Sequence, residues 1–506
     1  MSPMKKPTDA PLSDRRFAAS EWQQWPYRAM AQSFLAQQQW WQEATTGIKG
    51  LSSHQKQLLS FSVRQVLDMF SPSNFLWSNP EAQHVTVKTG GANLLQGLRN
   101  RRENALRLLS GGPVPGTENF RPGHEVAITP GKVVFRNHLM ELIQYTPQTE
   151  TVFAEPVLIV PSWILKFYIL DLSPQNSMVK YLVEQGHTVF IVSWKNPDAS
   201  DRDVGMDTYL KSGVMGAIDA VCDIMPKRKV QAVGYCLGGT LLAMAAAYMA
   251  RMHDDRLSSL TLLASELDFT EPGELGLFID DAQLALLDQA MSRKGYLDGK
   301  QMAGAFALLN SRDLVWSRME REYLLGKRQK VNDLAAWNAD TTRMPYRQHS
   351  EYLHRLYLNN ELAAGRCLVD GIPISLADIR LPVFALGTVR DTVSPWQSVY
   401  KVHLLMHTEI TFCLTSGGHN AGIVNPPGPD ARHSYQMAVH GQEDHHTDPS
   451  AWIQTAPSHE GSWWLAWKDW LQTHSGKRGK PPAMGGTGHT VLEDAPGSYV
   501  LKEPIL

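Results

Sequence analysis

A cysteine at position 236 stands in the heptapeptide GYCLGGT (234–240), between two apolar segments. Residues 229–233 have the pattern of a short buried strand, and residues 241–250, rich in Ala, Leu and Met, that of a helix packed into a core. A strand, a sharp glycine-flanked turn and a helix form the context of a nucleophile elbow. Free N–H groups at the start of the helix would favour a nucleophilic thiolate. The alternative is a core thiol beside a packing glycine.

Two further candidates follow in the chain, each directly after a predicted strand. Asp391 follows residues 381–387 and His419 follows residues 409–414, so one helix and one strand separate Asp391 from His419. Hydrolases with a nucleophile elbow supply nucleophile, acid and histidine in this chain order. The pattern therefore predicts a catalytic triad of Cys236, His419 and Asp391. Taken singly, Asp391 could instead cap the following helix, and His419 could be a surface histidine.

The elements that must position these residues predict an α/β-hydrolase fold, with a mostly parallel central sheet flanked by helices. We expect a helical N-terminal region over 1–140, with the first ~18 residues disordered. The catalytic domain then covers 141–506. Within it, residues 269–380 form a helix-rich cap, and residues 474–506 a loose surface tail.

The cap is predicted because a hydrolase core needs only a helix between the strands that flank this insertion. Aromatic residues such as Trp316 and Tyr346 lie along it. We expect the cap to close the elbow from solvent and to open for substrate entry and product exit. A packed accessory subdomain without gating is the alternative.

Composition agrees with an ordinary globular enzyme. The 506 residues are 43% hydrophobic and 19% charged, with a net charge of −2, which argues against nucleic acid as a main partner. The cysteines lack metal-ligand spacing and indicate a reducing compartment. They are Cys222, Cys236, Cys367 and Cys413. We expect neither a secretory signal nor a membrane span.

From about residue 60 onward, the chain resembles the polyhydroxyalkanoate (poly-beta-hydroxybutyrate) synthases of the long, single-subunit type. Distinct segments along the chain carry the resemblance. They are SPSNFLWSNPEA (71–82), WILKFYILDL (163–172), YLVEQGHTVF (181–190), SWKNP (193–197), LDF (267–269), residues 310–316, WNAD (337–340), SGGH (416–419), NPP (425–427), GSWW (461–464) and PGSYV (496–500).

The resemblance implies an acyltransferase that polymerises (R)-3-hydroxyacyl-CoA into polyester with release of CoA. Cys236 would carry the acyl thioester, His419 would act as base and Asp391 would orient it. The backbone N–H groups of Leu237 and of the Trp163–Ile164 loop are the candidate oxyanion donors. Ser162 and Leu165, beside that loop, stand where the family usually has proline and asparagine.

The resemblance also implies a homodimer, in the cytoplasm at the surface of polyester storage granules, with granule-associated proteins as further partners. It implies no metal, prosthetic group or other cofactor, since CoA is part of the substrate and a released product. Chain length and tail suggest the type that uses 3-hydroxybutyryl units. Two other functions stay open: a thiol-type esterase or intracellular polyester depolymerase, and a catalytically silent granule-associated homologue.

Overall fold

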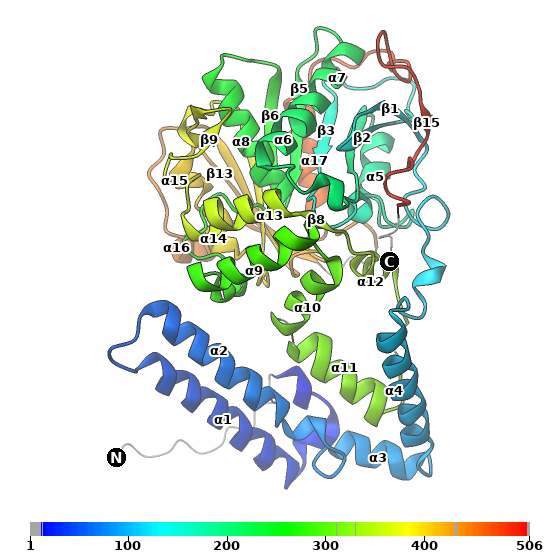
Figure 1. Cartoon of the computed structure of the whole chain (residues 1–506), viewed down its shortest axis with the longest axis vertical. Helices are drawn as coiled ribbons and strands as arrows, with labels where there is room; N and C mark the ends of the chain where they lie inside the picture. Colours follow the sequence, from blue (N-terminus) through cyan, green and yellow to red (C-terminus); the bar gives the residue numbers. More distant parts are fainter. Residues whose placement is uncertain (1–11, 13, 310, 329, 430–432, 503–506) are drawn as a thin grey trace. The chain divides into compact units, whose positions relative to one another are not determined.

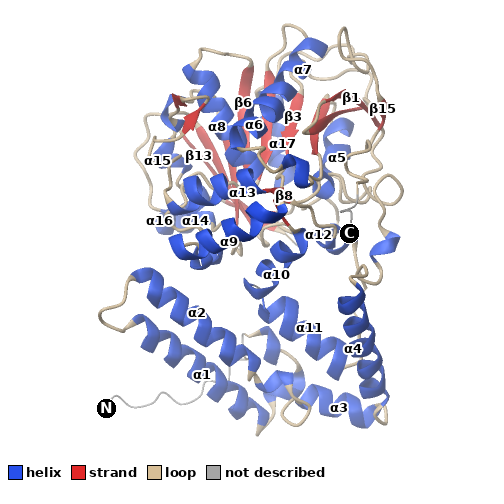
Figure 2. Cartoon of the chain, in the orientation of Figure 1, coloured by secondary structure: helices blue, strands red, loops and turns tan. Residues whose placement is uncertain are grey.

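The computed structural model describes residues 12, 14–309, 311–328, 330–429 and 433–502. It divides the chain into two compact units, which we describe separately. Unit 1 comprises residues 1–115 and 303–331, and unit 2 comprises residues 116–302 and 332–506. Unit 1 is helical, and the strands lie in unit 2 (Figures 1 and 2).

Unit 1 is built on long helices whose polar side chains hold a second chain segment. The helices are α1 (Tyr27–Thr46), α2 (Ser53–Met69), α3 (Pro80–Lys88) and α4 (Ala92–Ser110). The second segment includes the end of α10 (Gly299–Leu309), α11 (Ser317–Met319) and π-helical turns around α11. Asn93 Nδ2 donates to the Leu324 carbonyl, and Asn100 Nδ2 donates to the Glu322 carbonyl. These buried amides fix α4 on the segment that the sequence assigned to the cap.

Unit 2 contains, among the described residues, one sheet of eleven strands in the order β14-β13-β12-β11-β6-β5-β3-β4-β2-β1-β15. The six strands from β12 to β4 in this order pair in parallel, and antiparallel strands complete both edges. The strands are β1 (Gly131–Arg136), β2 (Met140–Tyr145), β3 (Val157–Val160), β4 (Val189–Trp194), β5 (Val230–Tyr235), β6 (Leu257–Leu263), β11 (Val383–Thr388), β12 (Ile410–Thr415), β13 (Ser434–His440), β14 (Ser458–Glu460) and β15 (Glu493–Asp494).

The central strands are apolar because helices cover both faces of the sheet. Alternate residues point to opposite faces, so Leu158 and Val160 join one core and Val157 and Ile159 join the other. The first core also contains α7 (Gly216–Ile224) and α8 (Leu237–Arg251), and the second contains α5 (Met178–Glu184) and α17 (Trp463–Thr473). This agrees with the predicted α/β-hydrolase fold.

The rest of unit 2 consists of short elements, many of them in the predicted cap. The helices are α6 (Met206–Thr208), α9 (Asp281–Lys294), α12 (Asp333–Ala339), α13 (Tyr346–Tyr352), α14 (Trp396–Tyr400), α15 (Val402–Leu405) and α16 (Pro449–Thr455). The small hairpin pairs are β7 (Tyr296–Leu297) with β8 (Met344–Pro345), and β9 (Leu368–Val369) with β10 (Ile372–Pro373).

Three boundaries differ from the expected ones. Unit 2 begins at Gly116 instead of near residue 140, because β1 and β2 pair with each other and β2 pairs with β4. The expected cap, 269–380, is divided between the units, because residues 303–331 belong to unit 1 and the rest of the cap belongs to unit 2. The expected loose tail is instead tied to the sheet, because β15 pairs with β1 and Val500 is buried.

The expected disorder of the first ~18 residues falls largely outside the described residues. Near its end, Arg15–Phe17 form a 3-10 helix with Phe17 buried in a small core with Trp22 and Phe34. Residues 15–17 are therefore packed, although they fall within the stretch that we expected to be disordered.

Candidate active site

Cys236 lies in a tight turn between β5 and α8. Its backbone has φ 54° and ψ −128°, a conformation that is strained for a residue with a side chain and that recurs at functional sites. A Cβ on Gly234 would lie 2.2 Å from the Gly239 Cα, so the strand and helix meet this closely only because both residues are glycines. The Cys236 N–H donates to the Leu263 carbonyl on β6 at 2.9 Å. The predicted elbow geometry is therefore present.

Asp391 and His419 follow the neighbouring strands β11 and β12, whose carboxyl ends lie at the same edge of the sheet as that of β5. Asp391 Oδ2 and His419 Nδ1 are 2.7 Å apart, and both side chains are largely buried. Asp391 Oδ1 accepts from the N–H groups of Val393 and Ser394 at 2.9 and 2.8 Å. Pro395 occupies the N-cap of α14, so Asp391 is held by the loop and faces the histidine.

The pKa of His419 depends on Cys236 as well as on Asp391. Burial by itself would lower the pKa of His419, but the negative charges of Asp391 and Cys236, and the hydrogen bonds of both with the imidazole, raise this pKa well above its usual value. The Tyr235 hydroxyl donates to Asn420 Oδ1 at 2.7 Å and steadies the histidine loop. The three predicted residues are thus brought together, with the histidine between the carboxylate and the thiol.

The loop after β3 lies against the first turn of α8, and each of them contains one of the expected oxyanion donors. Leu237 is the first residue of α8, so its N–H has no partner within the helix. The Ile164 N–H, by contrast, donates to Ser162 Oγ at 3.2 Å. As an oxyanion donor, Ile164 would have to exchange this bond for one to the substrate. Thr342 of the cap donates to the Ile164 carbonyl and fixes the loop further.

The part of the cap that belongs to unit 2 contributes two buried tyrosines to the surroundings of Cys236. Tyr352 ends α13, and Tyr357 lies in the π-helical turn that follows. Their hydroxyls hydrogen-bond to each other, and their ring centroids are 5.2 Å apart. Burial raises the pKa of both well above the usual value, and the charges of Cys236 and Glu266 act in the same direction. Aromatic cap residues therefore lie close enough to Cys236 for its charge to act on them.

Glu266 is a second carboxyl group near the three predicted residues, and no sequence motif pointed to it. The residue is 3% exposed. Burial raises its pKa well above the usual value, and the negative charges of Asp391 and Cys236 raise it further. The available signal was an acidic residue soon after an apolar strand. That signal was weak, because such a residue more often lies in solvent.

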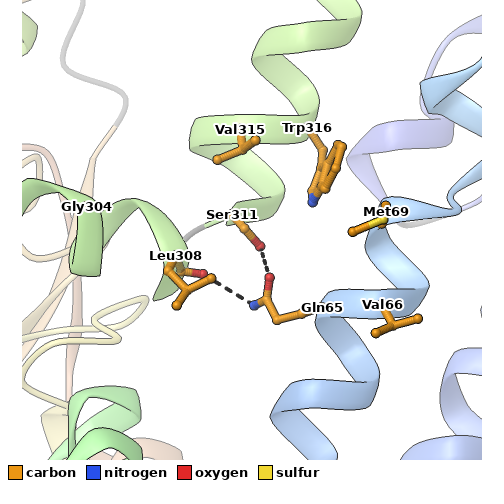
Figure 3. A pocket seen from close by; sticks show the side chains of 8 residues that line it. All are labelled: Gln65, Val66, Met69, Gly304, Leu308, Ser311, Val315 and Trp316. Atoms are coloured by element: carbon orange, nitrogen blue, oxygen red, sulfur yellow. Dashed lines mark hydrogen bonds between the residues drawn. The ribbon is translucent and has the colours of Figure 1, made fainter. Parts of the chain in front are cut away.

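No group of three or more His, Cys, Asp or Glu side chains among the described residues could hold a metal ion. Nor does any helix in the described part of the chain have the length and apolarity to cross a membrane. An apolar groove in unit 1 (Figure 3) contains none of the three triad residues. It is lined by Gln65, Val66, Met69, Gly304, Leu308, Ser311, Val315 and Trp316.

Comparison with known proteins places this geometry in context. Residues 13–182 match the family model described as poly-beta-hydroxybutyrate polymerase (PhaC) N-terminus, and residues 155–426 match the alpha/beta hydrolase fold. The chain is 41% identical to the poly(3-hydroxyalkanoate) polymerase of Methylorubrum extorquens, over 97% of this chain and 81% of that protein. It is 37% identical to poly(3-hydroxyalkanoate) polymerase subunit PhaC of Cupriavidus necator, over 99% and 85%. The resemblance drawn from the sequence motifs is confirmed.

Solved structures resemble the chain more distantly. The monoacylglycerol lipase of Paleococcus ferrophilus is 13% identical, with a TM-score of 0.36, over 66% of this chain and 99% of that one. A thioesterase domain from the curacin biosynthetic pathway is 15% identical, with a TM-score of 0.32, over 58% and 94%.

Proposed function

Because the chain belongs to the poly(3-hydroxyalkanoate) polymerase family, we propose that it polymerises (R)-3-hydroxyacyl-CoA into polyester with release of CoA, through a thioester on Cys236. The observation that carries this mechanism is the position of His419, bonded to both Asp391 and Cys236 at the carboxyl edge of the sheet. A cysteine suits the reaction, because exchange of one thioester for another is nearly thermoneutral.

The first step is acylation of Cys236. Its thiolate attacks the thioester carbonyl of the substrate, a new C–S bond forms, and the C–S bond to CoA breaks. The proton held on His419 passes to the departing CoA sulfur. In this proposal the Leu237 N–H, at the start of α8, stabilises the oxyanion, an effect of about 3–4 kcal/mol per donor in related chemistry.

The second step joins two acyl units. His419, now neutral, takes the proton from the 3-hydroxyl of another unit, and the hydroxyl oxygen attacks the acyl group on Cys236. An ester bond forms, the thioester breaks, and the thiolate–imidazolium pair is restored. Asp391 keeps the histidine oriented and stabilises its charged form through the 2.7 Å contact.

Water competes with that hydroxyl, and the cap is the element that would exclude it. The buried Tyr352 and Tyr357 next to Cys236 support this role. The cap opens for substrate entry and polymer exit in the proposed cycle. The cycle needs no metal or prosthetic group.

The proposal extends to assembly and location. Homodimer formation and a place on the surface of polyester granules, with granule-associated proteins, follow from the family resemblance. Light scattering of the purified protein tests the first. Sedimentation of the protein with granules from a polyester-accumulating host tests the second.

The decisive experiment follows CoA release from (R)-3-hydroxybutyryl-CoA and identifies the acyl product. Wild type should release CoA and form insoluble polyester, and Cys236→Ala should do neither. Cys222→Ala is the matched control, because this half-buried thiol lies on α7 outside the triad and should be dispensable. Free 3-hydroxybutyrate in place of polyester would indicate a thioesterase. Absence of CoA release from this and longer substrates would indicate a silent homologue.

A further inference from the structure

Glu266 is fixed by its backbone next to the elbow. It lies three residues beyond the end of β6, at the carboxyl edge of the sheet. Thr240 Oγ1, in the first turns of α8, donates to the Glu266 carbonyl at 2.7 Å. The side chain lies close enough to Cys236, Asp391 and His419 for their charges to act on it. The carboxyl group is therefore part of the immediate surroundings of the triad.

This carboxyl group is buried without a complete set of partners. Among the described residues, nothing hydrogen-bonds to its Oε1 atom, which is shielded from solvent. Lys401, whose charge also acts on it, forms its ion pairs with Asp268 and Glu271 at 3.6 and 3.2 Å. Burial of an unpaired polar group costs stability and is uncommon in native proteins. The unpaired Oε1 atom at this position therefore needs an explanation.

The groups around Glu266 also limit which kind of ligand could hydrogen-bond to its carboxyl group. The hydroxyls of Tyr352 and Tyr357 lie within range of the charge of Glu266, but they hydrogen-bond to each other. Phe269 packs on Tyr357 with ring centroids 4.8 Å apart, so the side chains on this side of Glu266 are aromatic. In such surroundings the neutral carboxylic acid is favoured, and it carries an O–H donor as well as acceptor oxygens. Its natural partner is a small uncharged group that both donates and accepts, such as an alcohol.

We propose that Glu266 hydrogen-bonds the 3-hydroxyl of the acyl group at Cys236 and so selects hydroxyacyl over plain acyl substrates. This inference rests on the proposed function. Glu266 would complete its hydrogen bonding only when a hydroxylated acyl chain is bound. An acyl chain without the hydroxyl leaves the buried carboxyl unpaired, and sites of this kind discriminate strongly against such analogues.

The test compares two substrates that differ by one hydroxyl, (R)-3-hydroxybutyryl-CoA and butyryl-CoA, in single-turnover CoA release. The quantity measured is the ratio of their acylation rate constants. Glu266→Leu, which is similar in size and apolar, should lower this preference at least ~10-fold. Glu266→Gln keeps a donor and an acceptor and should retain the preference within about 3-fold.

Ser265→Ala is the matched control. Ser265 is the buried neighbour of Glu266, and its hydroxyl donates to the Leu263 carbonyl. Its removal should leave the substrate ratio unchanged. A second readout is the apparent melting temperature, which Glu266→Leu should maintain or raise, because the variant removes an unpaired polar group.

The outcomes separate this inference from the proposed function. If wild type releases CoA and Glu266→Leu keeps the wild-type ratio, Glu266 does not bind the hydroxyl. Equal loss with both substrates, or a lower melting temperature together with an unchanged ratio, would assign Glu266 to the triad or to the fold and overturn the inference. A wild type that releases no CoA from either substrate would refute the proposed function itself, and this inference with it.

Discussion

Replacing Gly238 by alanine should lower activity, because the new methyl group would push the backbone at the end of β3 away from α8. Gly238 is the second residue of that helix, and a Cβ there would lie 2.3 Å from the Val160 carbonyl oxygen and 2.4 Å from that of Pro161. These distances are roughly 1 Å short of ordinary contact. Both oxygens belong to the backbone at the end of β3, so no side-chain rotation can relieve the clash. Overpacking of this kind costs about 1–3 kcal/mol of unfolding free energy.

The displaced segment leads into the loop that contains one candidate oxyanion donor, the Ile164 N–H, so activity should fall more than stability. A shift of ~1 Å at a reacting centre can cost about 10²-fold in rate. We therefore expect kcat/KM for CoA release to fall about 10²-fold. For a unit of this size, the loss of free energy should lower the apparent melting temperature by about 1–4 °C.

The control is Gly216→Ala. Gly216 begins α7 with helical φ −61° and ψ −34°, and its Cβ would meet only the Lys211 carbonyl oxygen, at 3.7 Å. Alanine should stabilise the helix there by about 0.5–1 kcal/mol and leave activity unchanged. Both variants are measured by CoA release and by thermal denaturation. Gly238→Ala with full activity and an unchanged melting temperature would refute the close approach of α8 to β3 and the reasoning built on it.

Three further predictions concern the triad and its neighbours. Asp391→Asn should keep the fold but lower kcat/KM by about 10³–10⁴-fold, and a loss under ~10-fold would contradict its orienting role. Because the folded pKa of His419 is raised above 6.5, its stabilising contribution is complete below that pH and is lost as pH rises through the folded pKa. The difference in apparent melting temperature between wild type and His419→Gln should therefore become smaller as the pH rises from 6 to 10. A difference that becomes larger with pH would contradict this reasoning. Iodoacetamide at pH 7.5 should modify Cys236 first, since burial raises the pKa of Cys367 to about 11 and also raises the pKa of Cys222 and of Cys413. Peptide mass spectrometry showing any of these three first would refute this order.

Local sequence was sufficient to predict the elbow and the chain order of the site. An apolar strand, glycines at 234 and 239 and an apolar helix leave few conformations for Cys236, because strand and helix can meet only where side chains are missing. Asp391 and His419 were predictable for a related reason. Each directly follows a strand, and the carboxyl ends of parallel strands meet at one edge.

Long-range pairing could not be predicted in the same way. The strands at 131–136 and 493–494 are short and mixed in polarity, so their place in the sheet depends on partners distant in the chain. The same holds for the segment 303–331, which the insertion pattern assigned to the cap. It packs on α4 through asparagine side chains that carry no periodic apolar signal.

The sequence by itself determined the fold class, the elbow and the order in which Cys236, Asp391 and His419 follow their strands, because these depend on local sterics and on apolar periodicity. Only the tertiary structure decided which polar groups near Cys236 have partners. It pairs the Ile164 N–H with Ser162 and buries Glu266 without a partner for Oε1. The physical reason is that burial and hydrogen bonding belong to a position in space, whereas a sequence pattern reports only the neighbours along the chain.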